Sequence, residues 1–399
     1  MAGPDPSRVP LVTRPAAVLY RHSPVGSPEA GRERIDQPAL LDLMLHRAGM
    51  PMRRASREAP FWKGEQLRSH AESSLPLADS PQATIGRVFG RVLAAFALHL
   101  IGESRRAHID EFFFLARDGY LPMRAYRAIR RAEPDRGALP KGIYLPISRR
   151  SSATTHPQLH DALARVGLLT SARPAVVDVG WHGTIQNRID ARLRAGNASA
   201  ASLGLYLCYS PMRSGHTART HQLRQGFLAD SRRGDWLEHF LFRHFAIFEA
   251  LLRAPHRTVV DHDASGPLLA AEPDPLPPAV RSIQARALET VHAYRGCAAL
   301  GIATASDLRL IALEHLRRLL HHPTRSEAEL LSSLSHDEPL LDPPPFERIG
   351  GIPLKGDSLE SQLERNYWPP GMLRMSGRPL ACLSREIEHA HRAGEGDWI

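Results

Sequence analysis

The chain has 399 residues, 43% of them apolar, so it can bury a sizeable core and hold two or three domains or one large one. Its 51 Lys and Arg outnumber its 42 Asp and Glu, and the formal net charge of +9 favours anionic partners. The basic residues are spread along the chain and are not interleaved with aromatic residues, a pattern that disfavours nucleic-acid binding.

The three cysteines lie far apart and form no CxxC pair, which excludes a disulfide framework and favours a reducing, cytoplasmic location. No segment has the pattern of a signal peptide. The stretch nearest to a membrane span, residues 85–101, is interrupted by two arginines and a histidine. The sequence therefore predicts a cytoplasmic protein without a membrane span.

The N-terminal third changes character near residue 80. Residues 1–35 are rich in Pro, Gly, Arg and Ser and predict a loose arm, and a short helix is expected at 39–48. Ser80 and Pro81 have the residue types of an N-cap and a first helical turn. Apolar residues then recur at three- and four-residue steps as far as Leu100, which predicts a strong amphipathic helix.

Strands alternate with helices through the middle of the chain, a pattern typical of a parallel sheet. The predicted strands are 112–115, 143–147, 176–179 and 203–209, and the predicted helices between them are 121–131, 159–166 and 185–194. The predicted fold class is α/β, with a mainly parallel Rossmann-like sheet, flanking helices and a helical C-terminal region.

The remaining segments predict the domain organisation. A long apolar helix is expected at 236–252, a proline-rich linker at 267–278 and further helices at 279–294 and 305–320. The expected parts are the arm 1–35, an α/β ligand-binding domain 36–266 that includes the N-terminal helices, and a helical region 279–399.

The most informative segment is AVVDVGWHGTIQ, residues 175–186. A short β-branched strand ends in Asp178, a glycine-rich loop follows, and a helix begins near Ile185. Gly180 and Gly183 would let the backbone approach an anion, towards which the helix N-terminus points free N–H groups. The pattern predicts a phosphate-binding loop, with a simple tight turn as the alternative. It is not a Walker loop, because no Lys follows Gly183 and Thr184.

Side chains of this loop supply candidate chemistry. Asp178 can take sugar hydroxyls or a metal ion, and His182 is a candidate acid or base. Replacing Gly183 by Val is expected to abolish ligand binding at little cost in stability.

Two upstream strands also end in polar residues, and open α/β sheets bind ligands at the carboxyl ends of their strands. These ends and the Asp178 loop are therefore expected to form one site, although each also fits an ordinary turn or a solvated loop. The candidate catalytic residues are Asp118, Asp178 and His182, and the candidate phosphate ligands are Arg117, Gly119, Ser148, Arg149, Arg150, Gly180, Gly183 and Thr184.

Three further features of the sequence bear on the chemistry of the predicted site. Glu249, in the long apolar helix, is expected to support the site as a base or as a partner of an arginine, with a structural helix-end acid as the alternative. The histidines form no metal-binding pattern, so no protein metal site is predicted, and magnesium stays open as a cofactor. Asp261 and Asp263 have the spacing of a phosphoaspartyl motif, but Gly266 and prolines follow where a helix is required, so a hairpin is predicted.

Three segments, Phe114–Tyr120, Ser148–Arg150 and Asp178–Gln186, carry a resemblance to the C-terminal portion of predicted haloacid-dehalogenase (HAD) superfamily hydrolases of bacterial surface-polysaccharide and lipopolysaccharide loci. The resemblance spans roughly residues 80–375. The phosphatase core of that family would lie upstream, where the first 80 residues leave no room for it. The resemblance therefore implies the appended domain rather than phosphatase activity.

A looser resemblance is to type I phosphoribosyltransferases. In that family one strand ends in an Arg-Gly loop for pyrophosphate, and a later strand runs into an acidic loop for the ribose phosphate. Arg117–Gly119 and Asp178–Thr184 occur in this order, although Val179 stands where the family has a second acid.

The expected function is the binding of a nucleotide, nucleotide-sugar or phosphosugar in surface-polysaccharide biosynthesis. One alternative is a transferase or hydrolase, phosphoribosyltransferase-like, that acts on such a ligand. The other is a non-catalytic module for a glycosyltransferase. A glycosyltransferase or a HAD phosphatase domain is the expected protein partner.

Overall fold

The computed structural model describes residues 80–153, 157–196, 201–210, 223–233, 241–242, 244–270, 276–299, 304–334, 349, 366 and 368–377. The chain divides into two units, Met1–Arg34 and Ile35–Ile399, and every described residue belongs to the second. The predicted arm and the predicted helix at 39–48 lie outside the described residues.

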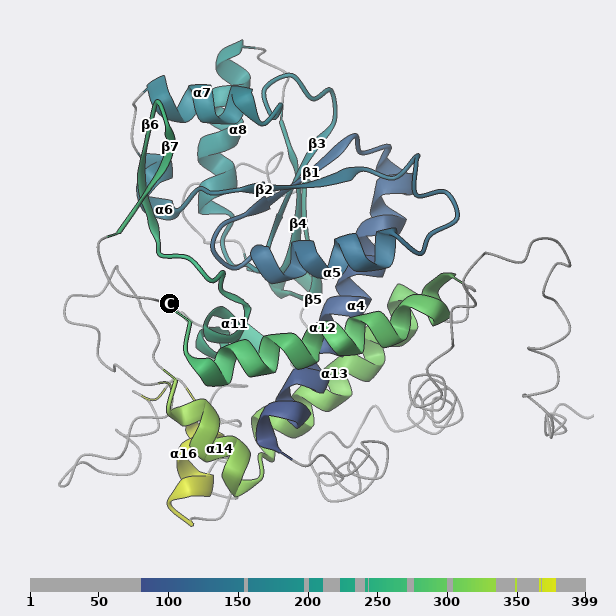
Figure 1. Ribbon diagram of the computed structural model, residues 1–399, viewed down its shortest axis with the longest axis vertical. Coiled ribbons are helices and arrows are strands. Elements are labelled where there is room, and N and C mark those ends of the chain that lie inside the picture. The colour runs from purple at the N-terminus through teal and green to yellow at the C-terminus, as the bar shows by residue number, and fades with distance from the viewer. Residues whose placement is uncertain are drawn as a thin grey trace, which may run out of the picture. The chain divides into compact units, whose positions relative to one another are not determined.

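A central sheet of five strands organises the fold (Figure 1). The strands are β1 (Glu111–Leu115), β2 (Lys141–Leu145), β3 (Pro174–Asp178), β4 (Leu203–Tyr209) and β5 (Arg224–Asp230). Their spatial order is β2-β1-β3-β4-β5, and every neighbouring pair is parallel, which confirms the predicted fold class. The chain moves from β1 to one side for β2 and returns to the other side for β3. The sheet therefore has its topological switch point between β1 and β3.

Helices cover both faces of the sheet, and the alternation along β1 shows how. Phe112 and Phe114 join the core that contains α4 (Pro81–Ala107) and α5 (Tyr120–Arg130). Phe113 and Leu115 join the core that contains α7 (Pro157–Arg165) and α8 (Thr184–Gly196). Because both faces are buried, β1 is a continuous apolar run, FFFL, rather than an alternating one.

Helix α4 begins as its sequence predicts. The Ser80 hydroxyl accepts a hydrogen bond from the Ala83 N–H at 3.2 Å, and Pro81 occupies the first turn. Among the described helices, α4 alone is long and apolar enough to cross a membrane, but 78% of its most apolar window is buried inside the protein. It is a core helix, along which α12 (Pro278–Ala299) and α13 (Ala305–His321) pack.

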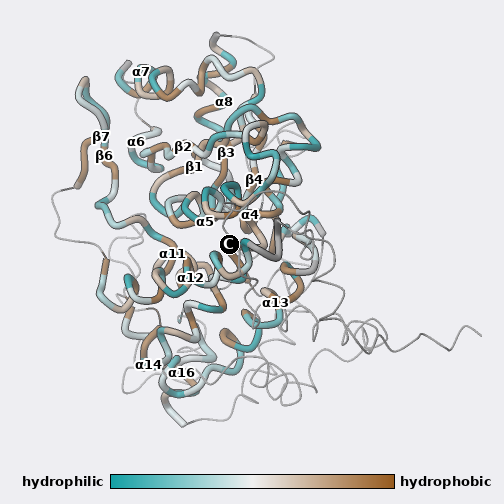
Figure 2. The backbone as a smooth tube through the Cα atoms, turned by 45° about the vertical axis from the view of Figure 1, so that its right-hand side comes forward, coloured by the Kyte–Doolittle hydropathy of each residue, from teal (hydrophilic) through white to brown (hydrophobic). Residues whose placement is uncertain are grey.

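The C-terminal part is helical, as predicted. It contains α11 (Phe245–Leu252), α12, α13, α14 (Arg325–Ser332) and α16 (Pro369–Met375), whose apolar stretches can be followed in Figure 2. Only part of the predicted helix at 236–252 lies among the described residues. Helix α14 begins with a capping box, in which Thr324 and Glu327 satisfy each other's backbone N–H groups.

The predicted linker at 267–278 is partly wrong, because its beginning is a strand. Strands β6 (Val259–Asp263) and β7 (Gly266–Leu269) pair as an antiparallel hairpin, and Pro267 is tolerated there because β7 is an edge strand. Asp261 therefore lies in a hairpin, as predicted. Short helices follow β2 and β5, namely α6 (Arg149–Ala153) and the 3-10 turn Ser231–Arg233.

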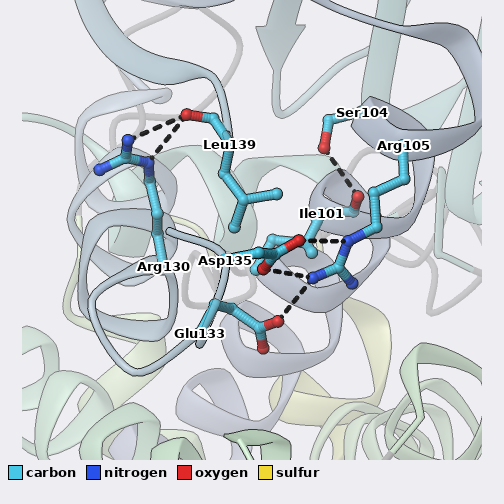
Figure 3. A network of polar contacts seen from close by, with 7 residues as sticks. All are labelled: Ile101, Ser104, Arg105, Arg130, Glu133, Asp135 and Leu139. Carbon is cyan, nitrogen blue, oxygen red and sulfur yellow. Dashed lines mark hydrogen bonds and ion pairs between the residues drawn. The ribbon is translucent and has the colours of Figure 1, made fainter. Parts of the chain in front are cut away.

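Arg105 holds the connection between α5 and β2, at the edge of the sheet where the strands begin (Figure 3). Its guanidinium binds Glu133 and Asp135, each at 2.8 Å from Nη2. Nearby, Arg130 donates to the Leu139 carbonyl at 2.9 Å. These contacts lie at the end of the sheet opposite to the predicted site.

Candidate functional site

The ends of β1, β2 and β3 meet at one edge of the sheet. In the parallel register, Leu115 lies opposite Leu145, and Phe114 lies opposite Val177. Arg117 lies two residues beyond Leu115, Arg149 four residues beyond Leu145 at the start of α6, and Asp178 directly after Val177. The prediction that the three polar strand ends share one edge is confirmed.

The loop after β3 presents free backbone donors. Gly183 has φ +68° and immediately precedes α8, where the Asn187 N–H donates to its carbonyl at 3.0 Å. None of the backbone N–H groups of residues 181–186 donates a hydrogen bond to a described residue. A helix leaves its first N–H groups without intrahelical acceptors, and an anion is a natural partner for them. The hydroxyl of Thr184, the first residue of α8, is likewise free of described partners.

The same loop docks on the end of β4, and this contact fixes the tautomer of His182. The Ser210 N–H donates to the Trp181 carbonyl at 2.8 Å, and Nδ1 of His182 lies 2.8 Å from the Ser210 carbonyl oxygen. A carbonyl can only accept, so Nδ1 carries the proton. In the neutral ring, Nε2 is then a free acceptor, as a general base requires.

Trp181 anchors the loop to α11. Its indole N–H donates to Oε1 of Glu249 at 2.9 Å, and its ring meets Phe242, Phe245 and Phe248 edge-on, with centroids 5.7–6.0 Å apart. Glu249 is therefore placed beside the β3 loop, where it accepts from an indole N–H; its role as a base or as a partner of an arginine stays a prediction. The bulky residue between the two glycines has a packing role.

Three carboxylates gather at the switch point. Burial raises the pKa of Asp178 well above its usual value, and the charges of Asp118 and Glu249 raise it further, against the opposing effect of Arg149. Oδ1 of Asp178 accepts the Val179 N–H at 2.8 Å. No three His, Cys, Asp or Glu side chains in the described ranges are arranged to hold a metal ion. A magnesium ion there would need ligand oxygens beyond those of the protein.

Arg117 ties the end of β1 to the connection between α11 and β6. Its Nη1 donates to the Thr258 hydroxyl at 3.3 Å, its carbonyl accepts the Ala254 N–H at 3.0 Å, and its Nε lies 4.0 Å from Asp118. At Gly119 a Cβ would lie 2.4 Å from the Leu115 carbonyl oxygen, so this tight turn requires glycine. The peptide bonds Ala116–Arg117 and Gly180–Trp181 are both cis.

Tyr144 and His256 join this edge and were not among the predicted site residues. The Tyr144 hydroxyl lies 2.5 Å from Nε2 of His256, whose Nδ1 lies 2.8 Å from the Arg257 carbonyl oxygen. Nδ1 therefore donates, and Nε2 accepts from Tyr144. Burial and the charge of Asp118 raise the pKa of Tyr144, which keeps the hydroxyl protonated.

The three predicted ligands after β2 differ in their surroundings. The Ser148 hydroxyl donates to the Val259 carbonyl at 2.6 Å and accepts the Ser151 N–H at 3.0 Å, so it caps α6 and holds the hairpin. Arg149 and Arg150 are exposed, and α8 braces their helix because Arg188 donates to the Arg149 carbonyl. Arg149 and Arg150, unlike Ser148, expose their side chains to solvent at this edge.

The two loop glycines are required by packing. At Gly180 a Cβ would lie 2.7 Å from the Cys208 carbonyl oxygen. At Gly183, which is buried, it would lie 2.9 Å from Nη1 of Arg224 and 3.0 Å from the Tyr206 hydroxyl. The expectation that Gly183 can be replaced at little cost in stability is therefore wrong.

No protein-family model matches the chain, and a search of curated proteins finds no match.

Proposed function

We propose that the chain binds a phosphorylated small molecule at the switch point between β1 and β3. The observation that carries the proposal is the β3 loop, whose backbone N–H groups at 181–186 have no acceptor among the described residues. They lie at the N-terminus of the 13-residue helix α8, whose dipole favours negative charge.

The surrounding side chains suit a phosphate attached to a sugar. Arg149 and Arg150 are exposed at the same edge and can bind phosphate oxygens. Asp118, Asp178 and Glu249 supply carboxylates for sugar hydroxyls. The resemblance to the appended domains of surface-polysaccharide hydrolases makes a nucleotide-sugar or phosphosugar the preferred ligand class.

Phosphoribosyl transfer is the second candidate. The resemblance to that family rests on two loops in a set order along the chain. In the sheet, the loop Arg117–Gly119 and the loop Asp178–Thr184 follow neighbouring strands, so they can contact one ligand from two sides. His182, with Nε2 free, is the side chain best placed to move a proton in such a reaction.

A ligand screen followed by a titration tests the proposal. Thermal shifts are measured with nucleotides, nucleotide-sugars, phosphosugars and phosphoribosyl pyrophosphate, each with and without magnesium. The best ligand is then titrated calorimetrically against the wild type and the Arg149→Ala variant. Loss of a hydrogen bond to a charged group is expected to weaken binding by about 1.5–3 kcal/mol.

Arg286→Ala is the matched control. Arg286 is exposed on α12, where Glu289, at 2.7 Å, is its one ion-pair partner among the described residues, and its removal is expected to leave affinity unchanged. A protein that none of these ligands stabilises would contradict the proposal and favour an interaction module.

A further inference from the structure

A wholly buried arginine lies beneath the β3 loop. Arg224 is the first residue of β5, and its side chain is 0% exposed. Its Nη2 donates to Oδ1 of Asn187 at 2.6 Å and lies 3.7 Å from Oδ2 of Asp190, both on α8. Its Nε and Nη1 have no hydrogen-bond partner among the described residues.

The charge of Arg224 is poorly compensated. Oδ1 of Asp190 already accepts the N–H and the hydroxyl of Ser202, at 2.9 and 2.7 Å. Buried guanidinium donors are normally paired, because an unmade hydrogen bond in the interior costs the desolvation of the group. Buried N–H donors without a partner indicate that a bound ligand supplies the missing hydrogen-bond acceptor.

One of the open donors, Nη1, lies beside the start of α8. Nη1 of Arg224 lies 2.9 Å from the position that a Cβ of Gly183 would occupy, and the Tyr206 hydroxyl lies 3.0 Å from it. This is the turn where the backbone N–H groups of residues 181–186 are free. Two independent sets of unpaired donors, one from β5 and one from α8, thus converge on one turn.

We infer that Arg224 and the N-terminal turn of α8 together form the subsite for one phosphate group of the ligand. The inference rests on the proposed function and specifies where the anion is held. Phosphate fits because its oxygens accept several hydrogen bonds at once, and the guanidinium offers planar donors to them. The absence of a side chain at Gly183 keeps Arg224 close to the turn.

The test uses inorganic pyrophosphate as the probe and the full chain. The Nε–H resonance of Arg224 is assigned in a ¹⁵N-correlated NMR spectrum by its loss in the Arg224→Lys variant. On titration of the wild type with pyrophosphate, this resonance and the amide resonances of Gly183–Gln186 are expected to shift together. Arg224→Lys is expected to weaken binding at least about tenfold.

Arg325→Lys is the control, because Arg325 is exposed on α14 and, within the part of the chain that the structure describes, pairs with Glu329 alone. If Arg224→Lys unfolds, the Nε–H resonance is assigned instead by through-bond correlation along the Arg224 side chain of the wild type, and its shift on titration decides the matter alone. Pyrophosphate binding that leaves the Arg224 resonance unmoved would overturn the subsite and leave the proposed function standing. No pyrophosphate binding by the wild type would also overturn the subsite, and the nucleotide screen then decides the proposed function separately.

Discussion

Replacing Gly183 by Ala is expected to destabilise the protein by more than the backbone angle alone requires. Gly183 has φ +68°, a region in which an L residue costs about 1–2 kcal/mol. The new Cβ would also lie 2.9 Å from Nη1 of Arg224 and 3.0 Å from the Tyr206 hydroxyl. Neither neighbour can move freely, since Arg224 is held by Asn187 and Tyr206 by Gln186. Overpacking of this kind adds about 1–3 kcal/mol.

Gly377 provides the matched control, because it has φ +69° and no atom of a described residue within 4 Å of its Cβ position. Gly377→Ala therefore reports the backbone cost alone. The two variants are compared by urea unfolding, with equal slopes checked before the free energies are subtracted. Gly183→Ala is expected to lose about 1–3 kcal/mol more than Gly377→Ala. Equal losses would refute the packing of Arg224 against the turn.

Three further substitutions test other parts of the structure. The raised pKa of Asp178 means that the folded state binds a proton that the unfolded state lacks, so the free energy of unfolding falls as the pH rises through that pKa. The Asp178→Asn variant should therefore be more stable than the wild type at neutral pH. The melting temperatures of the two proteins should converge below about pH 4, where Asp178 is protonated in both states. A constant gap across the pH series would contradict this. Arg318 and Glu327 form a buried pair, 4% and 3% exposed, so Arg318→Met should cost about 3–5 kcal/mol in denaturant unfolding. Adding Glu327→Gln should recover part of this loss, and strictly additive losses would argue against the pair. Asp261→Asn should leave ligand affinity and melting temperature unchanged, because Asp261 lies in a hairpin; lost turnover in a folded variant would identify it as a nucleophile.

The sheet could be predicted where its strands are apolar on both faces. Strand β4 has the predicted bounds, and β1 and β3 differ by one or two residues. Strand β2 ends two residues early, because Pro146 cannot donate to a ladder. Strand β5 was missed because its ends, Arg224 and Asp230, are charged. Arg224 can be buried because it contacts α8, 37 residues away in the sequence, which no local pattern encodes, and Asp230 can be buried because it pairs with Arg232.

Some residues of the candidate site could likewise be predicted from the sequence, and others could not. Arg117, Arg149 and Asp178 could be predicted because each lies at the carboxyl end of an apolar strand or within four residues of it, and parallel strands bring their carboxyl ends to one edge. Tyr144 and Arg224 could not, because their partners are 112 and 37 residues away in the sequence. Local residue types reveal strand ends, whereas pairs of this kind depend on the completed fold.

The most direct measurement of the central claim is a crystal structure of the protein with pyrophosphate, or with the best ligand of the screen, bound in solution before crystallisation. The claim predicts phosphate oxygens at about 2.7–3.2 Å from backbone nitrogens within residues 183–186, between the ends of β1 and β3. A fully occupied ligand elsewhere on the chain, with the β3 loop making no contact to it, would contradict the claim.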